Sequence, residues 1–211
     1  MLQEFAQQVE KAAKTCIWDI HTSIPGKILS FDSVKCTVSV QPSGKYVTVD
    51  GAELDYPVIP DAPVLFPCST SSGIGIAFPV KPGDSCLIVI SEAELDEWRT
   101  GAESEAHLRF DLTNAVVIPG LMSSGNAPLR KAIREEAIVL NAKNMEIVVS
   151  EGRASVRTDG VEMTVSGDRV SVTGNLAVSG NITATGDVSA GSVSLRGHRH
   201  PGVHGPTGSA Y

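Results

Sequence analysis

The C-terminal part of the chain repeats short pairs of apolar residues at the period of a β-strand. The two residues of a pair stand two positions apart, and a Gly, Ser, Asn or Asp follows them. From Val170 onward a new pair begins every five or six residues, and glycines keep the same interval. The pairs are Val161 and Met163, Val170 and Val172, Leu176 and Val178, Ile182 and Ala184, Val188 and Ala190, and Val193 and Leu195. This internal repeat predicts very short strands joined by turns.

Strands this short cannot enclose a core within one chain, because the apolar face would stay in water and the edges would stay unpaired. Two arrangements would bury the face. One chain could coil as a solenoid, or three chains could wind into a three-sided β-prism with Val and Ile on its axis. The strict repeat is long enough for only about two solenoid turns, and solenoids need at least three repeats for stability. The pattern therefore favours a trimeric shaft.

The N-terminal part has a different pattern. Apolar residues at helical spacing between Leu2 and Ile17 predict a short amphipathic helix, which must dock on something. From Ile24 to about Leu121, short β-type runs alternate with Gly- and Pro-rich turns, which predicts a small barrel or sandwich. The number of runs fits a five-stranded OB-type barrel. The expected fold class is therefore mainly β, with a short N-terminal helix, an OB-type barrel and an intertwined trimeric shaft.

Composition changes between the same two parts. No Phe, Trp or Tyr occurs from Asp111 to Ala210 in this chain of 211 residues, so the second part must build its interior without aromatic anchors. The net charge of −7 argues against nucleic-acid binding, which needs clustered Lys and Arg. The sequence shows neither a stretch of about 20 apolar residues nor a signal-peptide pattern. We therefore expect a soluble chain that is made in the cytoplasm.

The first part contains no recognisable catalytic pattern. Gly73 and Gly75 lack the third glycine of a phosphate loop, and His21 and His107 are isolated. No Ser, His and Asp or Cys and His set stands in a nucleophile context. The four cysteines match no zinc or redox spacing and are expected to be buried, reduced thiols: Cys16, Cys36, Cys68 and Cys86. The chain is therefore not expected to be an enzyme.

A group of carboxylates around Trp98 could suggest acid–base chemistry, which uses paired carboxyl groups. These residues are Glu92, Glu94, Asp96 and Glu97. We interpret them instead as a solvated acidic helix or loop with Trp98 packed inward.

The best candidate site lies near the C-terminus. His198 and His200 stand two apart and occupy the next inward pair of the repeat. In a three-chain shaft, both imidazoles of every chain would point at the axis and form an octahedral site. Imidazole suits Fe, Ni, Co, Cu and Zn, but structural zinc prefers four ligands, so an octahedral first-row ion such as iron is favoured. A closed ligand shell leaves no position for a substrate, so the site would be structural. His204 follows the strand-breaking Pro201 and is placed outside the ligand set.

Three segments resemble a known family. The runs SIPGKILSFDSVKCTVSVQP, FPCSTSSGIGIAFPVKPGDSCLIVISEAELDEW and DLTNAVVIPGL resemble the N-terminal domain of membrane-piercing spike proteins from contractile-tailed phages. The ending GHRHPGVHGPTG resembles the histidine-bearing apex of the same proteins. Together the similar segments cover about residues 20–128 and 160–205.

The resemblance implies a homotrimer at the tip of the tail baseplate. It implies an OB-fold collar that joins the baseplate hub, a β-helical shaft, and one iron ion per trimer held by His198 and His200 of each chain. Such spikes breach the outer membrane of a Gram-negative host when the tail sheath contracts. Further ions along the axis stay open. The expected segments are a helix (residues 1–20), a collar (21–128), a shaft (129–196) and an apex (197–211).

Three alternatives stay open at this point. The chain could be a trimeric carbohydrate-binding adhesin or tail-fibre module, which exposed aromatic residues on the barrel would favour. It could be the spike of a phage-tail-like bacteriocin, with the same physics. A metal-dependent hydrolase using His198, His200 and His204 would need an acidic ligand, and the nearest one in sequence is Asp187.

Overall fold

The computed structural model describes residues 2–18, 20–48, 50–101, 109–122, 126–203 and 205. The chain divides into two compact units, Met1–Ser124 and Gly125–Tyr211, and each is described by itself. The mainly β fold with a short N-terminal helix is confirmed. No helix in the described residues is long and apolar enough to cross a membrane.

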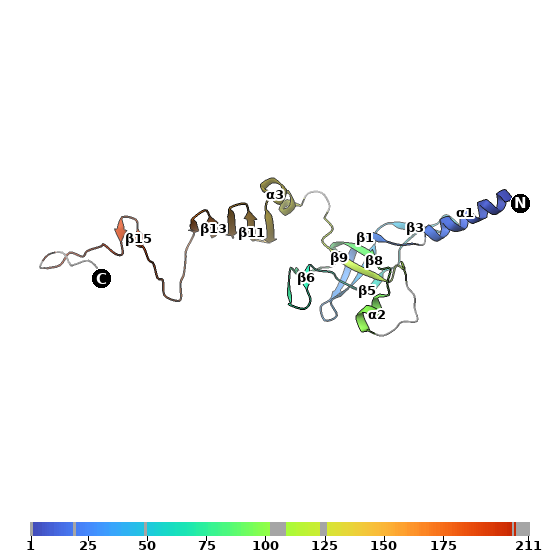
Figure 1. Cartoon of the computed structure of the whole chain (residues 1–211), viewed down its shortest axis with the longest axis horizontal. Coiled ribbons are helices and arrows are strands. Elements are labelled where there is room, and N and C mark those ends of the chain that lie inside the picture. The colour runs from blue at the N-terminus through green and yellow to red at the C-terminus, as the bar shows by residue number, and fades with distance from the viewer. Residues whose placement is uncertain are drawn as a thin grey trace. The chain divides into compact units, whose positions relative to one another are not determined.

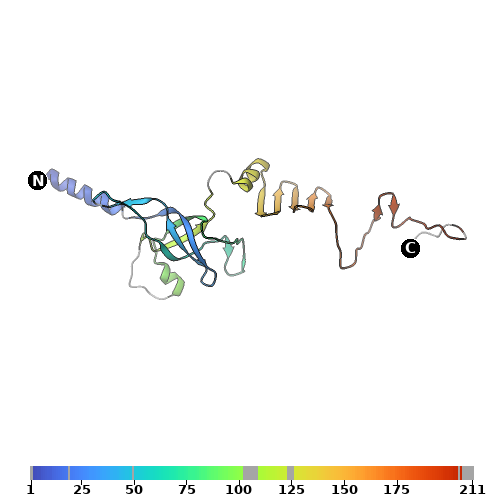
Figure 2. The ribbon, with the colours of Figure 1, turned by 180° about the vertical axis from the view of Figure 1, so that it is seen from behind.

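The first unit is built on a curled five-stranded sheet (Figures 1 and 2). Its strands pair in the order β5-β2-β1-β8-β9, and every neighbouring pair is antiparallel. Val64, directly after β5, forms a parallel bridge with Val117 of β9, which brings the two edges of the sheet together. This connectivity agrees with the expected OB-type barrel. The five strands are β1 (Ser23–Asp32), β2 (Thr37–Pro42), β5 (Ile59–Pro63), β8 (Ser85–Ile90) and β9 (Ala115–Pro119).

Smaller elements surround this sheet. Helix α1 (Leu2–Trp18) precedes it, and α2 (Leu95–Thr100) lies between β8 and β9. Two short hairpins are formed by β3 (Lys45–Val47) with β4 (Glu53–Asp55), and by β6 (Cys68–Ser69) with β7 (Ile74–Gly75).

The curled sheet encloses a hydrophobic core, because alternate residues of each strand point inward. Ile28, Val40, Ile59, Ile88 and Val117 are each at most 1% exposed. Burying side chains of this size stabilises a fold by about 1.5–3 kcal/mol each. The first unit thus has a core of its own.

The cysteines and Trp98 differ from expectation. Cys86 is buried, and burial raises the pKa of its thiol to about 11. Cys16, Cys36 and Cys68 are exposed free thiols, so the prediction of buried thiols is wrong for these three. The predicted acidic helix forms as α2, but Trp98 is 75% exposed and does not pack inward. The helix has only six residues, which is too short to turn a full apolar face toward the sheet.

The second unit begins with helix α3 (Ala127–Glu135) and continues as a five-stranded antiparallel meander. Its strands follow chain order as a row of hairpins (Figure 2). A short hairpin of β15 (Ser189–Ala190) and β16 (Val193–Ser194) follows further on. The meander consists of β10 (Ile138–Ala142), β11 (Met145–Ser150), β12 (Arg153–Arg157), β13 (Glu162–Ser166) and β14 (Arg169–Thr173).

Helix α3 occupies residues at which the sequence predicted the start of a β-shaft. Local signals explain it: the Asn126 side chain caps the helix by accepting a hydrogen bond from the Leu129 N–H, and Pro128 stands in the first turn. The helix ends at Glu136, whose φ of 46° is left-handed. The strands of the second unit therefore begin only at Ile138.

Candidate subunit interface and histidine tip

The meander of the second unit has one apolar and one polar face, and its register aligns the apolar residues in rows. One row crosses the strands through Leu140, Ile147, Val156, Met163 and Val172. A parallel row consists of Ile138, Val149, Ala154, Val165 and Val170. Because side chains alternate between faces, both rows lie on the same side of the sheet.

Nothing in the described part of the chain covers this apolar face. From residue 126 onward no described residue is buried, and Val156, Met163 and Val170 are 37%, 45% and 58% exposed. Contiguous apolar surface of this kind is rare on monomeric soluble proteins and marks an interaction site. The face is therefore the strongest candidate interface of the molecule.

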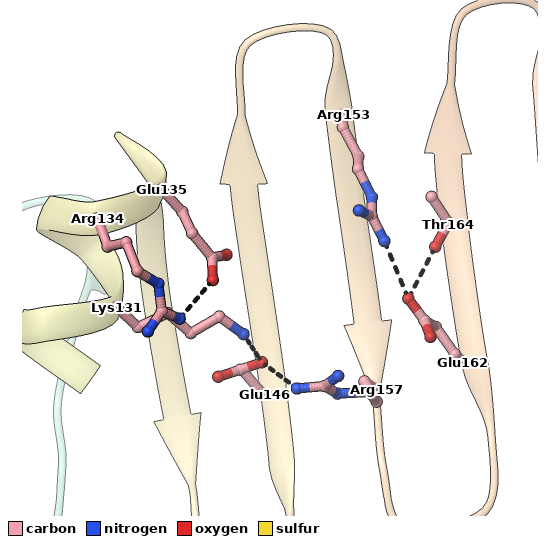
Figure 3. A network of polar contacts seen from close by, with 8 residues as sticks. All are labelled: Lys131, Arg134, Glu135, Glu146, Arg153, Arg157, Glu162 and Thr164. Carbon is pink, nitrogen blue, oxygen red and sulfur yellow. Dashed lines mark hydrogen bonds and ion pairs between the residues drawn. The ribbon is translucent and has the colours of Figure 1, made fainter. Parts of the chain in front are cut away.

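The opposite face is satisfied by ion pairs within the chain (Figure 3). The Glu146 carboxylate accepts hydrogen bonds from Lys131 of α3 and from Arg157 of β12. Arg153 donates to Glu162 on the neighbouring strand at 3.1 Å. The hydrogen bond from Lys131, together with the charges of Lys131 and Arg157, lowers the pKa of the Glu146 carboxyl. Val139 and Val148 pair with each other on this same face, and both are half-buried.

The segment between the β10–β14 meander and the β15–β16 hairpin has no regular secondary structure. Residues 174–188 contain no strand, although their sequence continues the apolar alternation of the repeat. Leu176 and Ile182 are each 72% exposed. Strand-like sequence with no ladder inside the chain has backbone N–H and C=O groups available for pairing with another strand. Such pairing would have to come from outside the chain.

His198 and His200 follow the β15–β16 hairpin, and their rings are close together. The ring centroids are 5.0 Å apart, and the two planes are almost perpendicular. The backbone N–H of His198 donates a hydrogen bond to the Ser194 carbonyl oxygen at 2.9 Å, and this bond closes a turn directly after β16. The structure thus brings together the two residues that the sequence pattern singled out.

The Nδ1 atom of His198 is held by two backbone carbonyl oxygens, those of Ser194 at 3.1 Å and Leu195 at 2.9 Å. Carbonyl oxygens only accept hydrogen bonds, so Nδ1 carries the proton and donates it. In this tautomer the lone pair of the ring is on Nε2. Metal-binding histidines are commonly oriented in this way, with the second ring nitrogen donating to a carbonyl.

A second carboxylate interaction fixes the hairpin before the histidines. Asp187 accepts hydrogen bonds from the Ser194 side chain and from the Arg196 N–H at 3.1 Å, and these lower the pKa of its carboxyl. Asp187 thus has a structural role in the turn, which weakens its candidacy as the acidic ligand of a hydrolase.

The described residues of one chain provide too few ligands for a metal centre. Among the described residues, no three His, Cys, Asp or Glu side chains gather to hold an ion. His204 lies outside the described residues. The imidazole pair fits a metal only as a part of a ligand set that other chains would complete.

Gly75, Glu92 and His21, which the sequence pattern also singled out, have contacts within the first unit. Gly75 is required by the tight β6–β7 hairpin, since a Cβ there would lie 2.3 Å from the Cys68 Cβ. Glu92 pairs with Arg109, and His21 packs edge-on against Tyr56. His107 lies outside the described residues.

Comparison with known proteins finds a family that matches most of the first unit. Residues 24–120, which include the curled sheet from Ile24 to Pro119, match the family described as phage protein Gp138 N-terminal domain. No curated protein matches the chain. The first unit is therefore similar to a domain of a phage protein, and this supports a structural role in a phage particle.

Proposed function

We propose that three copies of this chain form the spike at the tip of a contractile injection tail, which pierces the outer membrane of the host. The observation that carries the proposal is the uncovered apolar face of the β10–β14 meander, in a chain whose first unit matches a phage protein domain. Three copies arranged about an axis would bury this face and leave the ion-paired face outside.

The stretch 174–188 supports intertwining further along the shaft. Here each chain lacks internal strand partners, so its backbone groups would pair with the two other chains and close every edge. Bending such a shaft would break many hydrogen bonds together. Small Ser, Thr, Gly and Ala residues at the outer positions would keep it narrow.

The tip would hold one iron ion per trimer through His198 and His200 of each chain. The donor set fits, because the paired rings present imidazole nitrogen and His198 Nδ1 is already held by backbone carbonyls. The ion would serve as a structural cross-link of three chain ends, which otherwise fray first. With all positions taken by imidazole, the site would support no hydrolysis, so the chain is proposed to act mechanically and not as an enzyme.

In this proposal the OB-type barrel joins the spike to the baseplate hub or tail tube, and the sheath supplies the force. The chain would be assembled in the host cytoplasm and carried at the tip of the baseplate. It would need no nucleic acid. A spike from a phage-tail-like bacteriocin would work in the same way.

The test is metal content and mass of the purified full chain, by elemental mass spectrometry and light scattering. We expect a trimer with one iron per three chains, and loss of the iron in His198→Ala/His200→Ala while the trimer persists. His21→Ala is the matched control, because this histidine packs against Tyr56 of the first unit and should leave the iron unchanged. A monomer, or one metal per chain, would contradict the proposal.

A second candidate is a trimeric carbohydrate-binding adhesin or tail-fibre module, and exposed Trp98 favours it. An exposed indole offers a flat apolar surface with a polar edge, which suits a sugar ring. If host polysaccharide binds wild type and not Trp98→Ala, the adhesin gains support. Equal binding by both would count against it.

A further inference from the structure

Helix α1 carries an apolar stripe that nothing in the described part of the chain covers. Every described side chain of the helix is exposed, including Phe5 at 66% and Val9 at 52%. A surface helix of a folded domain normally buries this stripe against its own core. The stripe of α1 must therefore be buried by something else.

The spacing of the stripe fits packing against another helix. Phe5, Val9, Ala12 and Cys16 follow one another at intervals of four, three and four residues. Alternating intervals of three and four are the heptad pattern of helices that pack on one another in a coiled coil. The stripe thus fits a helix of the same kind.

The flanks of the stripe permit identical copies to approach. In this heptad the positions beside the core are Ala6, Gln8, Ala13 and Thr15, and none of them is charged. The charged residues of the helix take outer positions, where Glu10 and Lys14 pair with each other at 2.7 Å. Copies of α1 would therefore meet without repulsion between like charges.

We propose that α1 packs against the α1 helices of two other copies of this chain as a short, parallel, three-stranded coiled coil. The inference rests on the proposed trimer. A free helix of this length is marginal in water. Helix α1 ends at Trp18 and the barrel begins at Ser23, so the linker is short. Three barrels held together by the shaft would keep the helices at roughly millimolar effective concentration, which favours their association.

Cys16 provides a direct readout of this packing. It occupies a core position of the heptad and is an exposed free thiol in the single chain. In a parallel coiled coil, three Cys16 residues would lie in one layer at the axis, within the Cα distance that a disulfide needs. Docking of α1 on a different protein would bring no two of these thiols together.

The experiment uses the full chain with Cys36→Ser and Cys68→Ser, which leaves Cys16 and the buried Cys86. Diamide oxidises two Cys16 thiols to one disulfide and takes up their two electrons and two protons. Because three thiols in one layer can form one disulfide, we expect up to about two thirds of the chains as dimers on a non-reducing gel. Dithiothreitol should reverse the band.

Two variants test whether the disulfide depends on the core position of Cys16 in a coiled coil. Moving the thiol to the outer side of the helix, with Gln7→Cys and Cys16→Ser, should reduce the dimer to background. Val9→Asp should abolish the Cys16 dimer, because it places three carboxylates in the core of the coil, while light scattering still gives the trimer mass. Equal cross-linking from both cysteine positions, or a dimer that persists in Val9→Asp, would overturn the inference.

The outcomes separate this inference from the proposed function. A trimer without Cys16 dimers would overturn the coiled coil alone and leave the spike standing, with a hub protein as the remaining occupant of the stripe. A monomer would overturn both.

Discussion

The two units of this chain use the same alternation of apolar and polar residues, yet among the described residues only the first unit has a core. In the first unit, Ile28, Ile88 and Val117 are fully buried inside the curled sheet. In the second unit, Val156 and Met163 occupy equivalent alternating positions and stay exposed. The alternation of residue types therefore predicts which face of a strand is apolar. Whether one chain can bury that face depends on the curvature of the sheet.

The cause of the different curvature lies in the register. The pairing of β1 with β2 shifts between Ile28 and Ser30, and that of β2 with β5 shifts between Val38 and Val40. Such irregularities bend a sheet. At Gly26 the strands approach so closely that a Cβ would lie 2.6 Å from the Ile88 Cδ1. The meander β10–β14 pairs without any such shift and cannot close on itself.

The largest effect on assembly is expected from a charge on the apolar face of the second unit. In Val156→Asp, three carboxylates would enter the core of the proposed trimer, and an unpaired buried charge costs several kcal/mol. We expect this variant to sediment as a monomer and the wild type to sediment as the proposed trimer. Analytical ultracentrifugation measures the effect.

The matched control for this variant is Ser155→Asp, one residue earlier on the same strand and on the opposite, polar face. It should leave the trimer intact. If Val156→Asp also stays trimeric, the apolar face is not the interface and the second unit must be covered in another way.

A smaller effect is expected when the core of the first unit is reduced. Ile88 is fully buried, so Ile88→Ala should lower the free energy of unfolding of the barrel by about 2–5 kcal/mol. The proposed trimer should persist, because the strands of the β10–β14 meander belong to the other unit. Hydrogen exchange of the backbone amides of β1, β2, β8 and β9 measures the effect, since these strands form the sheet of the first unit.

The same substitution at an exposed site, Ile74→Ala in β7, is the control and should change the unfolding free energy by less than about 0.5 kcal/mol. Dissociation of the trimer by Ile88→Ala would instead show that the two units depend on each other.

The sequence predicted the curled sheet and the strands around Met163 and Val172, because they depend on local alternation and turns. It also predicted short strands at 176–178 and 182–184, where the single chain forms none. It missed α3, although Asn126 and Pro128 are recognisable start signals, because the charged residues that follow were interpreted as a break between strands. Exposure was harder to predict. Trp98 and Cys68 are apolar in type, but they lie on elements too short to direct them inward.

For the histidine site, the sequence predicted the pair of residues within one chain and not the groups that orient them. The spacing of His198 and His200 predicted that the two rings act together, and the structure places them 5.0 Å apart. The carbonyl groups that hold His198 Nδ1 come from Ser194 and Leu195, and they depend on a turn that the residue pattern does not specify. The rest of the proposed ligand set belongs to other copies.

The smallest expected effect concerns the polar face of the second unit, where charged side chains form ion pairs within the chain. Hydrogen bonding from Lys131 and the charges of Lys131 and Arg157 lower the pKa of the Glu146 carboxyl in the folded chain. Because the folded pKa is depressed, the stabilisation is complete above the unfolded value of about 4.3 and is lost as the pH falls through the folded pKa. Glu146→Gln should therefore unfold a few degrees lower than wild type at neutral pH.

This difference between Glu146→Gln and wild type should shrink as the pH falls below about 4, because the wild-type carboxyl then becomes neutral as well. Circular dichroism melts of the full chain at several pH values measure it. Glu151→Gln is the control: Glu151 lies in the turn between β11 and β12 and forms no ion pair within the described ranges. An equal decrease in both variants, or one that does not depend on pH, would show that the ion pairs add nothing to this face.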